Sequence, residues 1–580
     1  MSINVESYRS DVLVVGGGIA GAIAAIRARE LGRDVILVDK AFFGRSGCSA
    51  LASGVFAAYM PGDNMDTWLS IWGGGALVNR RLTKAAVLLT HELVMQMDEW
   101  GVKWVKENGR IYRERSGGTG TSDKINCLMA EGGPQFMMAV RRKALDIGVQ
   151  VLNRTMVTDV LTSDGQQPTK GAVMGAVGFD TRSGAQRVFQ AKATIICAGP
   201  YRFPFPTHST TGLHGMPIDV APDGQAMMMR AGAAMGKLEV GGLSPAPRES
   251  FSAPGLEILG GLGCRFVNEQ EVDILRVGSR DGEMGMWGRR SAISHAIARE
   301  VQAGRRVYLD IRHFTPEQMR LAQQVIPIVM ANYRMNGFDP ERDLIPYTSF
   351  LPITSGVSGG GACVNERGET TVQGLYAAGN DCDAAYLAMG QQLPGAAVSG
   401  CWAGEYAARD CLATFVEPNE RQVSKLLDAA VEPLQRLQGE NYEPVHDAIE
   451  EVVETALGRV LSGERIQQAR LRIQGIEERR VRQLRARDIH DLAKVHGLKN
   501  FCEMARAVLL VMEHRQESRG NILREDYPYT DNERWLCYTR LKRNADGSYD
   551  IWDEPRPNTD DYINIPRTRE MHPYFARSAA

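Results

Sequence analysis

The stretch that decides the fold is residues 11–39, DVLVVGGGIAGAIAAIRARELGRDVILVD. The apolar run at residues 12–15 predicts a short buried strand, and the Ala-rich residues 22–31 predict a helix. Gly32 ends that helix, and residues 35–38 predict a second strand. This order of strand, helix and strand is typical of the first unit of a doubly wound α/β domain.

The glycine-rich turn between strand and helix, GGGIAG at residues 16–21, has the spacing of a dinucleotide-binding motif. Gly16 permits the tight turn, Gly18 lets a pyrophosphate approach the backbone, and Gly21 lets the helix pack closely on the strand. The helix N-terminus adds N–H groups and positive potential for the phosphates. Asp39 ends the next strand, where a carboxylate accepts hydrogen bonds from ribose hydroxyls. The pattern predicts a dinucleotide site; the alternative is a tight turn that binds no ligand.

Two later strands end in small residues, as expected at the ligand-binding edge of such a sheet. Residues 193–199, ATIICAG, run from an apolar strand into a glycine, and residues 371–380, TVQGLYAAGN, end in Gly379 and Asn380. The segment LPGAAVSG at residues 393–400 then begins a helix of small residues. Its Pro-Gly start suits a helix end that packs against a flat ligand.

The composition of the 580 residues excludes several classes of protein. The chain is 44% hydrophobic and 23% charged, which is ordinary for a globular protein and unlike a disordered chain. With 67 basic and 69 acidic residues the formal net charge is -2, so neither a nucleic acid nor an anionic membrane is expected as the main partner. No apolar run approaches the length of about 18 residues that marks a membrane-spanning segment, and we expect a cytoplasmic protein.

The ten cysteines are scattered and form no C-x-x-C pair. An iron–sulfur cluster, a zinc ribbon or a haem attachment within this chain is therefore not expected, nor is another metal site.

Residues 418–519 are poor in glycine and show a 3.6-residue periodicity that predicts a bundle of three or four helices. Residues 538–580, rich in Pro, Asp, Asn and Tyr, predict either an arm that lies on a partner or a loosely packed surface segment.

Three further segments carry a resemblance to a known family. Residues 44–54, GRSGCSALASG, resemble its flavin-contacting loop. Residues 374–380, GLYAAGN, are similar to its G-L-Y-A-A-G-E strand end, and residues 517–528, ESRGNILREDYP, to its C-terminal E-S-R-G-x-x-x-R-E-D-x-P motif. With the turn at residues 16–21, these motifs resemble the flavoprotein subunits of the succinate dehydrogenase and fumarate reductase family, and within it most of all the alpha subunits of adenylylsulfate reductases.

The resemblance implies FAD as the cofactor. Binding would be non-covalent, because Gly47 stands where the dehydrogenases of the family carry the histidine that links the flavin. The helix that begins near Gly395 would direct its positive end at the flavin, which stabilises the anionic reduced form. The residues implied to bind FAD are Gly16, Gly18, Ala20, Gly21, Asp39, Lys40, Ser46, Gly47, Cys48, Ala198, Gly199, Asp223, Gly379, Asn380, Gly395, Ala397 and Val398.

The family chemistry implies transfer of a hydride between flavin N5 and a substrate carbon, with a proton moved at the neighbouring carbon. Arg290 stands at the position of the proton-carrying arginine, and Glu257 at that of the glutamate that relays the proton. An arginine acid requires burial and a paired carboxylate, because its unperturbed pKa is about 12.5 or above. The alternative is a surface arginine at a helix start and an ordinary loop glutamate. His295 lies a little over one turn further on, either near the site or in the core.

The residues that hold a dicarboxylate in the succinate and fumarate enzymes are absent. Two histidines, a threonine and an arginine of the family are replaced by Ser244, Ser355, Leu256 and Gln392 respectively. These replacements remove the charge-assisted hydrogen bonds that two carboxylates require. We therefore expect a small, neutral or singly charged substrate, in a pocket that Arg290 borders and that is lined by Ser244, Trp287, Ser355, Tyr386 and Gln392.

The resemblance also implies the division of the chain and its partners. We expect a split FAD-binding domain at residues 1–243 and 345–416, a capping domain at 244–344, a helical domain at 417–530 and a tail at 531–580. Electrons would be exchanged with a separate iron–sulfur, ferredoxin-like subunit, for which the tail provides part of the docking surface; the alternative is a soluble acceptor such as oxygen or a quinone. An oligomer is possible. Two alternatives stay open: an oxidase of the L-aspartate oxidase kind, and a flavin electron-transfer subunit without substrate chemistry of its own.

Overall fold

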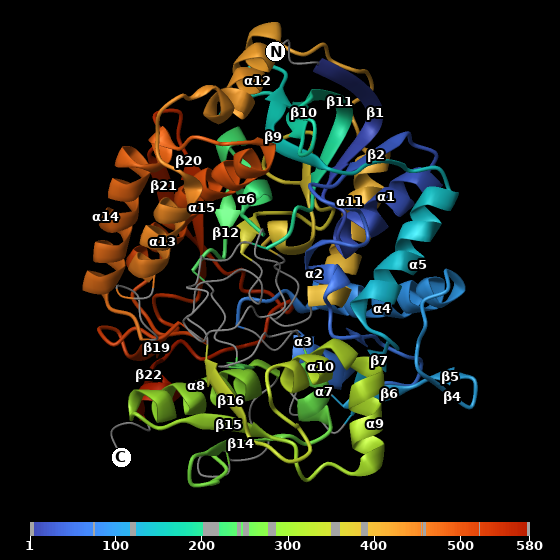
Figure 1. The fold of residues 1–580 in the computed structure, drawn as a ribbon, viewed down its shortest axis with the longest axis vertical. Helices are drawn as coiled ribbons and strands as arrows, with labels where there is room; N and C mark the ends of the chain where they lie inside the picture. The colour runs from blue at the N-terminus through green and yellow to red at the C-terminus, as the bar shows by residue number, and fades with distance from the viewer. Residues whose placement is uncertain are drawn as a thin grey trace.

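A computed structural model gives the fold (Figure 1). It describes residues 5–72, 76–115, 123–200, 220–239, 245–247, 255–275, 286–349, 360–383, 392–453, 455, 460–520 and 522–576. The structure confirms the predicted α/β class, with a large sheet at one end of the molecule and a cap lobe, defined here as residues 245–349, at the other.

The large sheet is built around the predicted strand–helix–strand unit, whose helix is α1 (Ile19–Glu30). Its central strands are parallel, and two antiparallel strands extend one side. In spatial order the strands are β8 (Gln150–Leu152), β2 (Val35–Val38), β1 (Val5–Val15), β11 (Gln186–Ile196), β10 (Val173–Asp180) and β9 (Thr155–Thr162), with β18 (Leu375–Ala377) beside β11.

The first strand is longer than its apolar run predicts. The sequence reads residues 1–10 as a short polar terminus, but β1 begins at Val5 and pairs in parallel with β11 along most of its length. Its first residues alternate between exposed and half-buried. Backbone hydrogen bonds to β11 hold this part in the sheet, and a hydrophobicity pattern does not reveal such bonds.

Small residues let the helices lie unusually close to one another on the sheet. Gly400 and Gly404 of α11 (Gln392–Arg409) face α1, where an added Cβ would collide with the carbonyl oxygens of Ala20 and Ala24. α5 (Gly133–Asp146) also packs on α1. The remaining elements before the cap lobe are α2 (Gly47–Ala50), β3 (Val55–Ala57), α3 (Met65–Trp72), α4 (Arg80–Glu99), β4 (Lys106–Glu107), β5 (Arg110–Ile111), β6 (Arg113–Arg115), β7 (Lys124–Leu128), α6 (Asp223–Ala231) and β12 (Met235–Gly236).

The cap lobe has a core of its own around Phe266 and Leu309. Its sheet runs in the order β13 (Pro245–Pro247), β16 (Ile345–Ser349), β15 (Val307–Asp310) and β14 (Arg265–Asn268). Because β16 is hydrogen-bonded to β15, the cap sheet continues beyond residue 344, where the sequence placed the boundary. Its helices are α7 (Leu256–Gly261), α8 (Met286–Gln302), α9 (Pro316–Val325) and α10 (Pro327–Met335).

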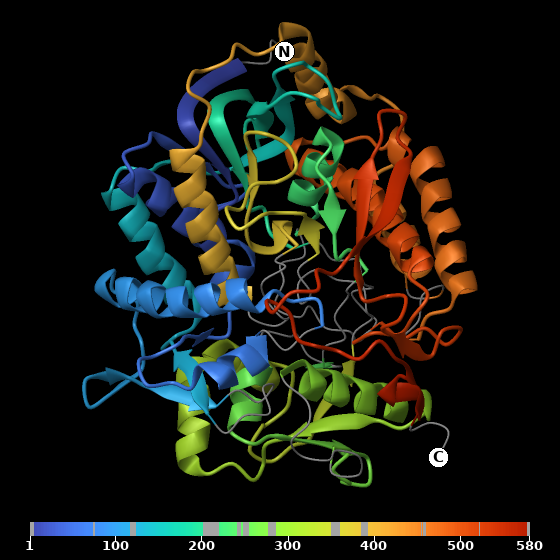
Figure 2. The same cartoon turned by 180° about the vertical axis from the view of Figure 1, so that it is seen from behind.

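The periodic region forms helices, as predicted, and they lie beside the large sheet (Figure 2). They are α12 (Glu420–Gln435), α13 (Tyr442–Val452), α14 (Gly463–Arg479) and α15 (Ile489–His514). The long helix α15 is mostly buried and packs against α6. In the part of the chain that the structure describes, no helix is both long and apolar enough to cross a membrane.

The segment after α15 is packed more firmly than its composition predicts. A second sheet has the order β17 (Gly361–Ala362), β12, β20 (Cys537–Arg543) and β21 (Tyr549–Pro555). Most residues of β20 are buried, and Arg540 pairs with the buried Asp383 at 2.7 Å. Further elements are β19 (Tyr529–Asp531), β22 (Arg569–Met571) and α16 (Pro573–Ala576), where Tyr574 stacks edge-on against His295 of α8. His295 is therefore a core residue.

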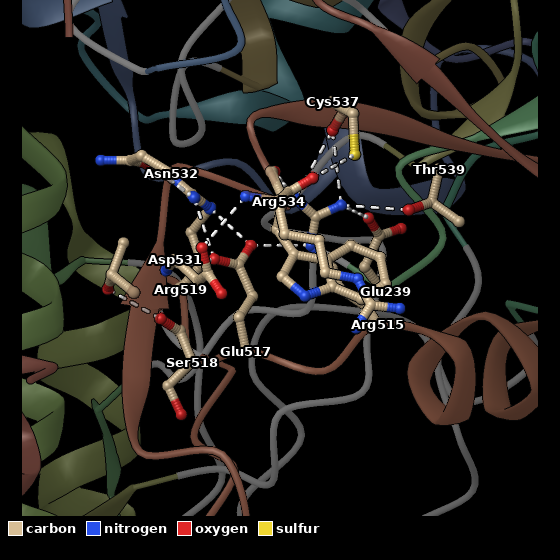
Figure 3. Close-up of polar contacts among 12 residues, drawn as sticks. Glu239, Arg515, Glu517, Ser518, Arg519, Asp531, Asn532, Arg534, Cys537 and Thr539 are labelled. Carbon is tan, nitrogen blue, oxygen red and sulfur yellow. Dashed lines mark hydrogen bonds and ion pairs between the residues drawn. The ribbon is translucent and has the colours of Figure 1, made fainter. Parts of the chain in front are cut away.

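A network of charged side chains anchors this segment (Figure 3). Glu517 is fully buried and is held by Arg515 at 2.9 Å and by Arg519 at 2.7 Å. Arg515 also reaches Glu239, which follows β12, at 3.2 Å. The backbone N–H of Asp531 donates to Glu517 at 3.0 Å. The motif at residues 517–528 is thus a structural junction between the end of the chain and the strand β12.

Replacing Glu517 by Gln should destabilise the protein by about 3–5 kcal/mol, because two arginines would lose their buried counter-charge. Urea unfolding followed by tryptophan fluorescence measures the loss. Glu533→Gln is the matched control: Glu533 is exposed, and its replacement should change stability by less than about 0.5 kcal/mol. Equal stability of the two variants would contradict the role of Glu517.

Candidate functional site

The turn at residues 16–21 has four glycines, and all but Gly18 stand where an added Cβ would collide with neighbouring atoms. Gly16 has φ +113°, and an added Cβ there would collide with the carbonyl of Cys197. A Cβ on Gly21 would collide with the carbonyl of Gly16. Around a Cβ on Gly18, the described residues place only Ser49 Oγ, at 3.4 Å. Free space therefore lies beside Gly18, where the sequence predicts a pyrophosphate.

The N-terminus of α1 points its backbone donors at this space. The N-cap residue of α1 is Gly18, which has no side chain to accept a hydrogen bond from the first N–H groups of the helix. Ser49 Oγ accepts from the N–H of Ile19 at 3.0 Å, so it ties the helix start to the loop that carries α2. Ser49 lies next to Cys48 but was not among the predicted residues. A helix start of this kind offers N–H groups and positive potential to an anion.

Asp39 fixes the turn and the following loop together. Its carboxylate accepts from the N–H of Gly17 at 3.0 Å, from the N–H of Ala41 at 2.7 Å and from Ser46 Oγ at 3.1 Å. Burial raises the pKa of Asp39, whereas these three donors oppose the rise. The predicted ribose acceptor therefore lies directly behind the phosphate turn, and the predicted Ser46 bonds to it.

The ends of β11 and β18 are joined by two side chains that sequence reasoning missed. Asp381 accepts from the N–H of Gly199 at 2.9 Å. Gln225 donates to the carbonyl of Gly199 at 3.0 Å and to that of Asn380 at 2.9 Å. Gly199 has φ +105°, and among the described residues nothing lies within 4 Å of an added Cβ. The open edge of the sheet is thus bordered by Ala198, Gly199 and Asn380. Asp381 could have been predicted from the sequence because it is an acidic residue directly after Asn380.

The start of α11 joins the same edge. Ser399 Oγ accepts from the N–H of Gly379 at 2.9 Å and donates to the carbonyl of Gly395 at 2.8 Å. The predicted Ala397 and Val398 are buried between this helix and the sheet. A helix that begins at the ligand-binding edge stabilises negative charge near its N-terminus.

Two predicted cofactor residues, Lys40 and Asp223, pair with each other. Lys40 Nζ lies 2.9 Å from Asp223, whose other carboxylate oxygen accepts from Asn500 of α15 at 2.8 Å. Burial alone would raise the pKa of Asp223, but Lys40 and Asn500 hold it below its usual value. The pair connects the end of β2 to the helical bundle through α6.

The predicted substrate and catalytic side chains are not placed. Ser244, Ser355 and Tyr386 lie outside the described residues. Glu257 is in α7, Arg290 and Trp287 are in α8, and Gln392 begins α11, but the side chains of these four also lie outside the described part. Their roles stay predictions.

The residues at the sheet edge fit FAD. Open space beside Gly18, a helix start whose N-cap is a glycine and a carboxylate at the end of β2 suit the pyrophosphate and ribose of a dinucleotide. Gly47, with φ +76° and nothing described within 4 Å of an added Cβ, leaves room beside its loop. The residues that the structure brings to or behind this edge are Gly16, Gly18, Ala20, Gly21, Asp39, Ser46, Gly47, Cys48, Ala198, Gly199, Gly379, Asn380 and Gly395.

Comparison with known proteins agrees with this geometry. Residues 11–398 match the model of an FAD binding domain, and residues 446–569 match the C-terminal domain of fumarate reductase flavoproteins. The first match covers more than half of the chain, which shows that the protein is an FAD-dependent oxidoreductase.

Relatives of similar length are found among curated proteins. The chain is 25% identical over 578 residues to one of the subunits of the fumarate reductase (CoM/CoB) of Methanothermobacter marburgensis, a match that covers 94% of this chain and 99% of the relative. It is 26% identical over 589 residues to a fumarate reductase flavoprotein subunit of Mycobacterium tuberculosis, with 93% and 95% covered.

Solved structures share the fold. Quinol fumarate reductase of E. coli superposes with a TM-score of 0.81 at 22% identity, over 97% of this chain and 98% of that one. Adenylylsulfate reductase of Archaeoglobus fulgidus gives a TM-score of 0.80 at 19% identity, over the same shares. The chain therefore belongs to the succinate dehydrogenase and fumarate reductase flavoprotein family.

Proposed function

We propose that this oxidoreductase transfers a hydride between flavin N5 and a small substrate that is not a dicarboxylate. The observation that carries the proposal is the loss of the dicarboxylate ligands. Ser244 and Ser355 stand at the positions of two histidines, and Gln392 at that of an arginine. Neutral side chains cannot offset two carboxylate charges. Bound FAD supplies the hydride chemistry, and the chain supplies the rest.

The chain's own residues bind and orient the cofactor. The α1 N-terminus and Gly18 would receive the pyrophosphate, Asp39 the ribose, and the start of α11 the flavin end. Arg290 of α8, relayed by Glu257 of α7, would carry a proton to the substrate carbon next to the one that exchanges the hydride. Both elements belong to the cap lobe, which would shield the transfer from water.

A separate iron–sulfur, ferredoxin-like protein would exchange electrons with the flavin. The ten cysteines include no C-x-x-C pair, so the sequence offers no cluster ligands in a known spacing. Two relatives are themselves named as subunits, which supports a partner. Because β20 is buried, docking would fall to exposed parts of the terminal segment, such as the outer strand β21, with Trp552 40% exposed, and β22.

The experiment that tests this function is an anaerobic titration of the purified holoenzyme with a panel of small reductants, read as flavin bleaching. We expect succinate to leave the flavin oxidised and a monocarboxylate or neutral compound to bleach it. An excess of oxidised two-cluster ferredoxin should then restore the flavin absorbance faster than oxygen does. Bleaching by succinate would contradict the proposed substrate class.

Arg290→Ala should lower the rate of bleaching by about 10²–10⁴-fold, because general acid–base catalysis contributes that much. Its FAD content should not change. Arg306→Ala is the control, since Arg306 is exposed in the cap lobe and should react at the rate of the unmodified enzyme. Unchanged rates in Arg290→Ala would exclude Arg290 as the acid, whereas failure of every compound in the panel to bleach the unmodified enzyme would favour a flavin electron-transfer subunit.

Replacing Gly18 by Ala should weaken FAD binding by about tenfold to a hundredfold, which is the loss expected for one charge-assisted hydrogen bond. The added methyl group would occupy the open space beside Gly18, and among the described residues it would contact only Ser49 Oγ. The melting temperature of the FAD-free protein should therefore not change. Gly21→Ala, which collides with the Gly16 carbonyl, should lower it. Fluorescence titration with FAD reads the affinity, and normal affinity in Gly18→Ala would place the pyrophosphate elsewhere.

The buried Asp381 should make the protein less stable as pH rises. Burial raises its pKa to about 8, far above the ordinary 3.8, and Asp223 adds repulsion. Between these values the folded protein holds a proton that the unfolded chain releases, so stability falls by about 1.4 kcal/mol per pH unit from this group.

Asp381→Asn should remove that slope. Between pH 5 and pH 7 the unfolding free energy of the variant relative to the unmodified protein should rise by up to about 2.7 kcal/mol, as measured by urea unfolding. Asp428→Asn, at an exposed position, should give a constant difference. A constant difference for Asp381→Asn as well would mean that this carboxyl is ionised in the fold.

A further inference from the structure

A cavity of about 460 Å³ lies where α13 and α15 meet the flavin-binding part of the chain. Residues 40–42, Arg154 and Arg182 form one wall, and residues of the two helices form the other. Among the described residues that line it, none belongs to the turn at residues 16–21, and Asp39 is not one of them. The space is therefore distinct from the phosphate turn, and the proposed reaction does not use it.

Four cationic side chains line this cavity. Arg154, Arg182 and Lys494 line it, and within the described residues none of the three forms an ion pair. Lys40 adds a fourth cation, which is paired with Asp223. No Asp or Glu is among the described lining residues. Unpaired cations that face one space favour an anion of more than one negative charge.

The rest of the lining is apolar and aromatic. Phe42 lies on one wall, and Tyr442, Leu498 and Phe501 lie on the other. The ammonium group of Lys494 sits 5.9 Å from the centre of the Tyr442 ring. The volume is in the range of small-molecule sites, about 300–1,000 Å³. The cavity therefore suits a ligand that joins a flat apolar body to a multiply charged anionic group.

Arg154 holds a strained backbone at the wall. Its φ is +56°, a conformation that side-chain-bearing residues rarely adopt. The N–H of Arg154 donates to the carbonyl of Ala41 at 2.9 Å, and its carbonyl accepts from the N–H of Thr181 at 2.7 Å. These bonds fix an unpaired guanidinium-bearing residue beside Lys40 and Arg182, and such strain is concentrated at ligand sites.

We propose that this cavity binds a nucleoside polyphosphate in addition to FAD. The base would lie on the apolar wall of Phe42, Leu498 and Phe501, and the polyphosphate would meet Arg154, Arg182 and Lys494. The walls come from two parts of the chain, so the ligand joins the helical bundle to the end of β2. Lys40 directly follows Asp39, which places the ligand next to the adenosine end of the cofactor site.

Isothermal titration of the FAD-loaded protein with ATP tests the proposal, with inorganic pyrophosphate and adenosine as separate arms. We expect one ATP per chain, weaker binding of pyrophosphate and of adenosine, and no release of FAD. Arg182→Gln and Lys494→Gln should each weaken ATP binding by about tenfold or more. Arg421→Gln and Lys425→Gln remove the same charge from exposed positions of α12 outside the cavity and should bind ATP normally.

Three results would overturn the proposal. One is the absence of heat on titration of the FAD-loaded protein with millimolar ATP. A second is binding that appears only after FAD removal and that FAD displaces, which would make the cavity part of the cofactor's adenosine site. A third is equal affinity in the cavity variants and the α12 controls, which would show non-specific attraction. FAD content, measured on the same samples, distinguishes each of these from a failure of cofactor binding.

Discussion

Close approach of backbone to backbone at one edge of the large sheet is the constraint on which the site depends. Gly16 leaves no room for a Cβ against Cys197, and Gly21 leaves none against Gly16. The same closeness recurs between α1 and α11, where Gly400 touches the backbone of Ala20. Dense glycine packing brings two helix N-termini to a single edge. The positive ends of both helices then act on the same ligand space.

In the segment after α15, buried ion pairs take the place of close glycine packing in joining distant parts of the chain. The Arg515–Glu517–Arg519 network and the Arg540–Asp383 pair connect the terminal segment to β12 and to the residues after β18. Apolar side chains of similar size would pack there at no greater cost. Charged pairs instead tolerate few alternative arrangements, since any mismatch leaves a charge without its partner. Their contribution is to the specificity with which distant segments meet.

Much of the fold could be predicted from local patterns in the sequence. The turn at residues 16–21, Asp39 and the strand at residues 35–38 were predictable because the pattern that marks them is local: the contact between Gly17 and Asp39 spans only 22 residues. Asp381 was not, because its partner Gly199 is 182 residues away and no local period marks the contact. The strand β20 was missed because the long segment that contains most of it, residues 538–580, is rich in Pro, Asp and Asn, and because its partners β12 and β21 are not marked by any local pattern. The motif at residues 517–528 identified the family without revealing that it is a junction.

The pairing of β12 with β20 links the first part of the chain to nearly its last. Because synthesis proceeds from the N-terminus and domains fold as they emerge, β12 waits with an unpaired edge until translation is almost finished. An unpaired edge invites association with other chains. Prematurely terminated products would keep that edge exposed, whereas complete ones cover it. Only chains that extend through β20 can cover this edge of β12.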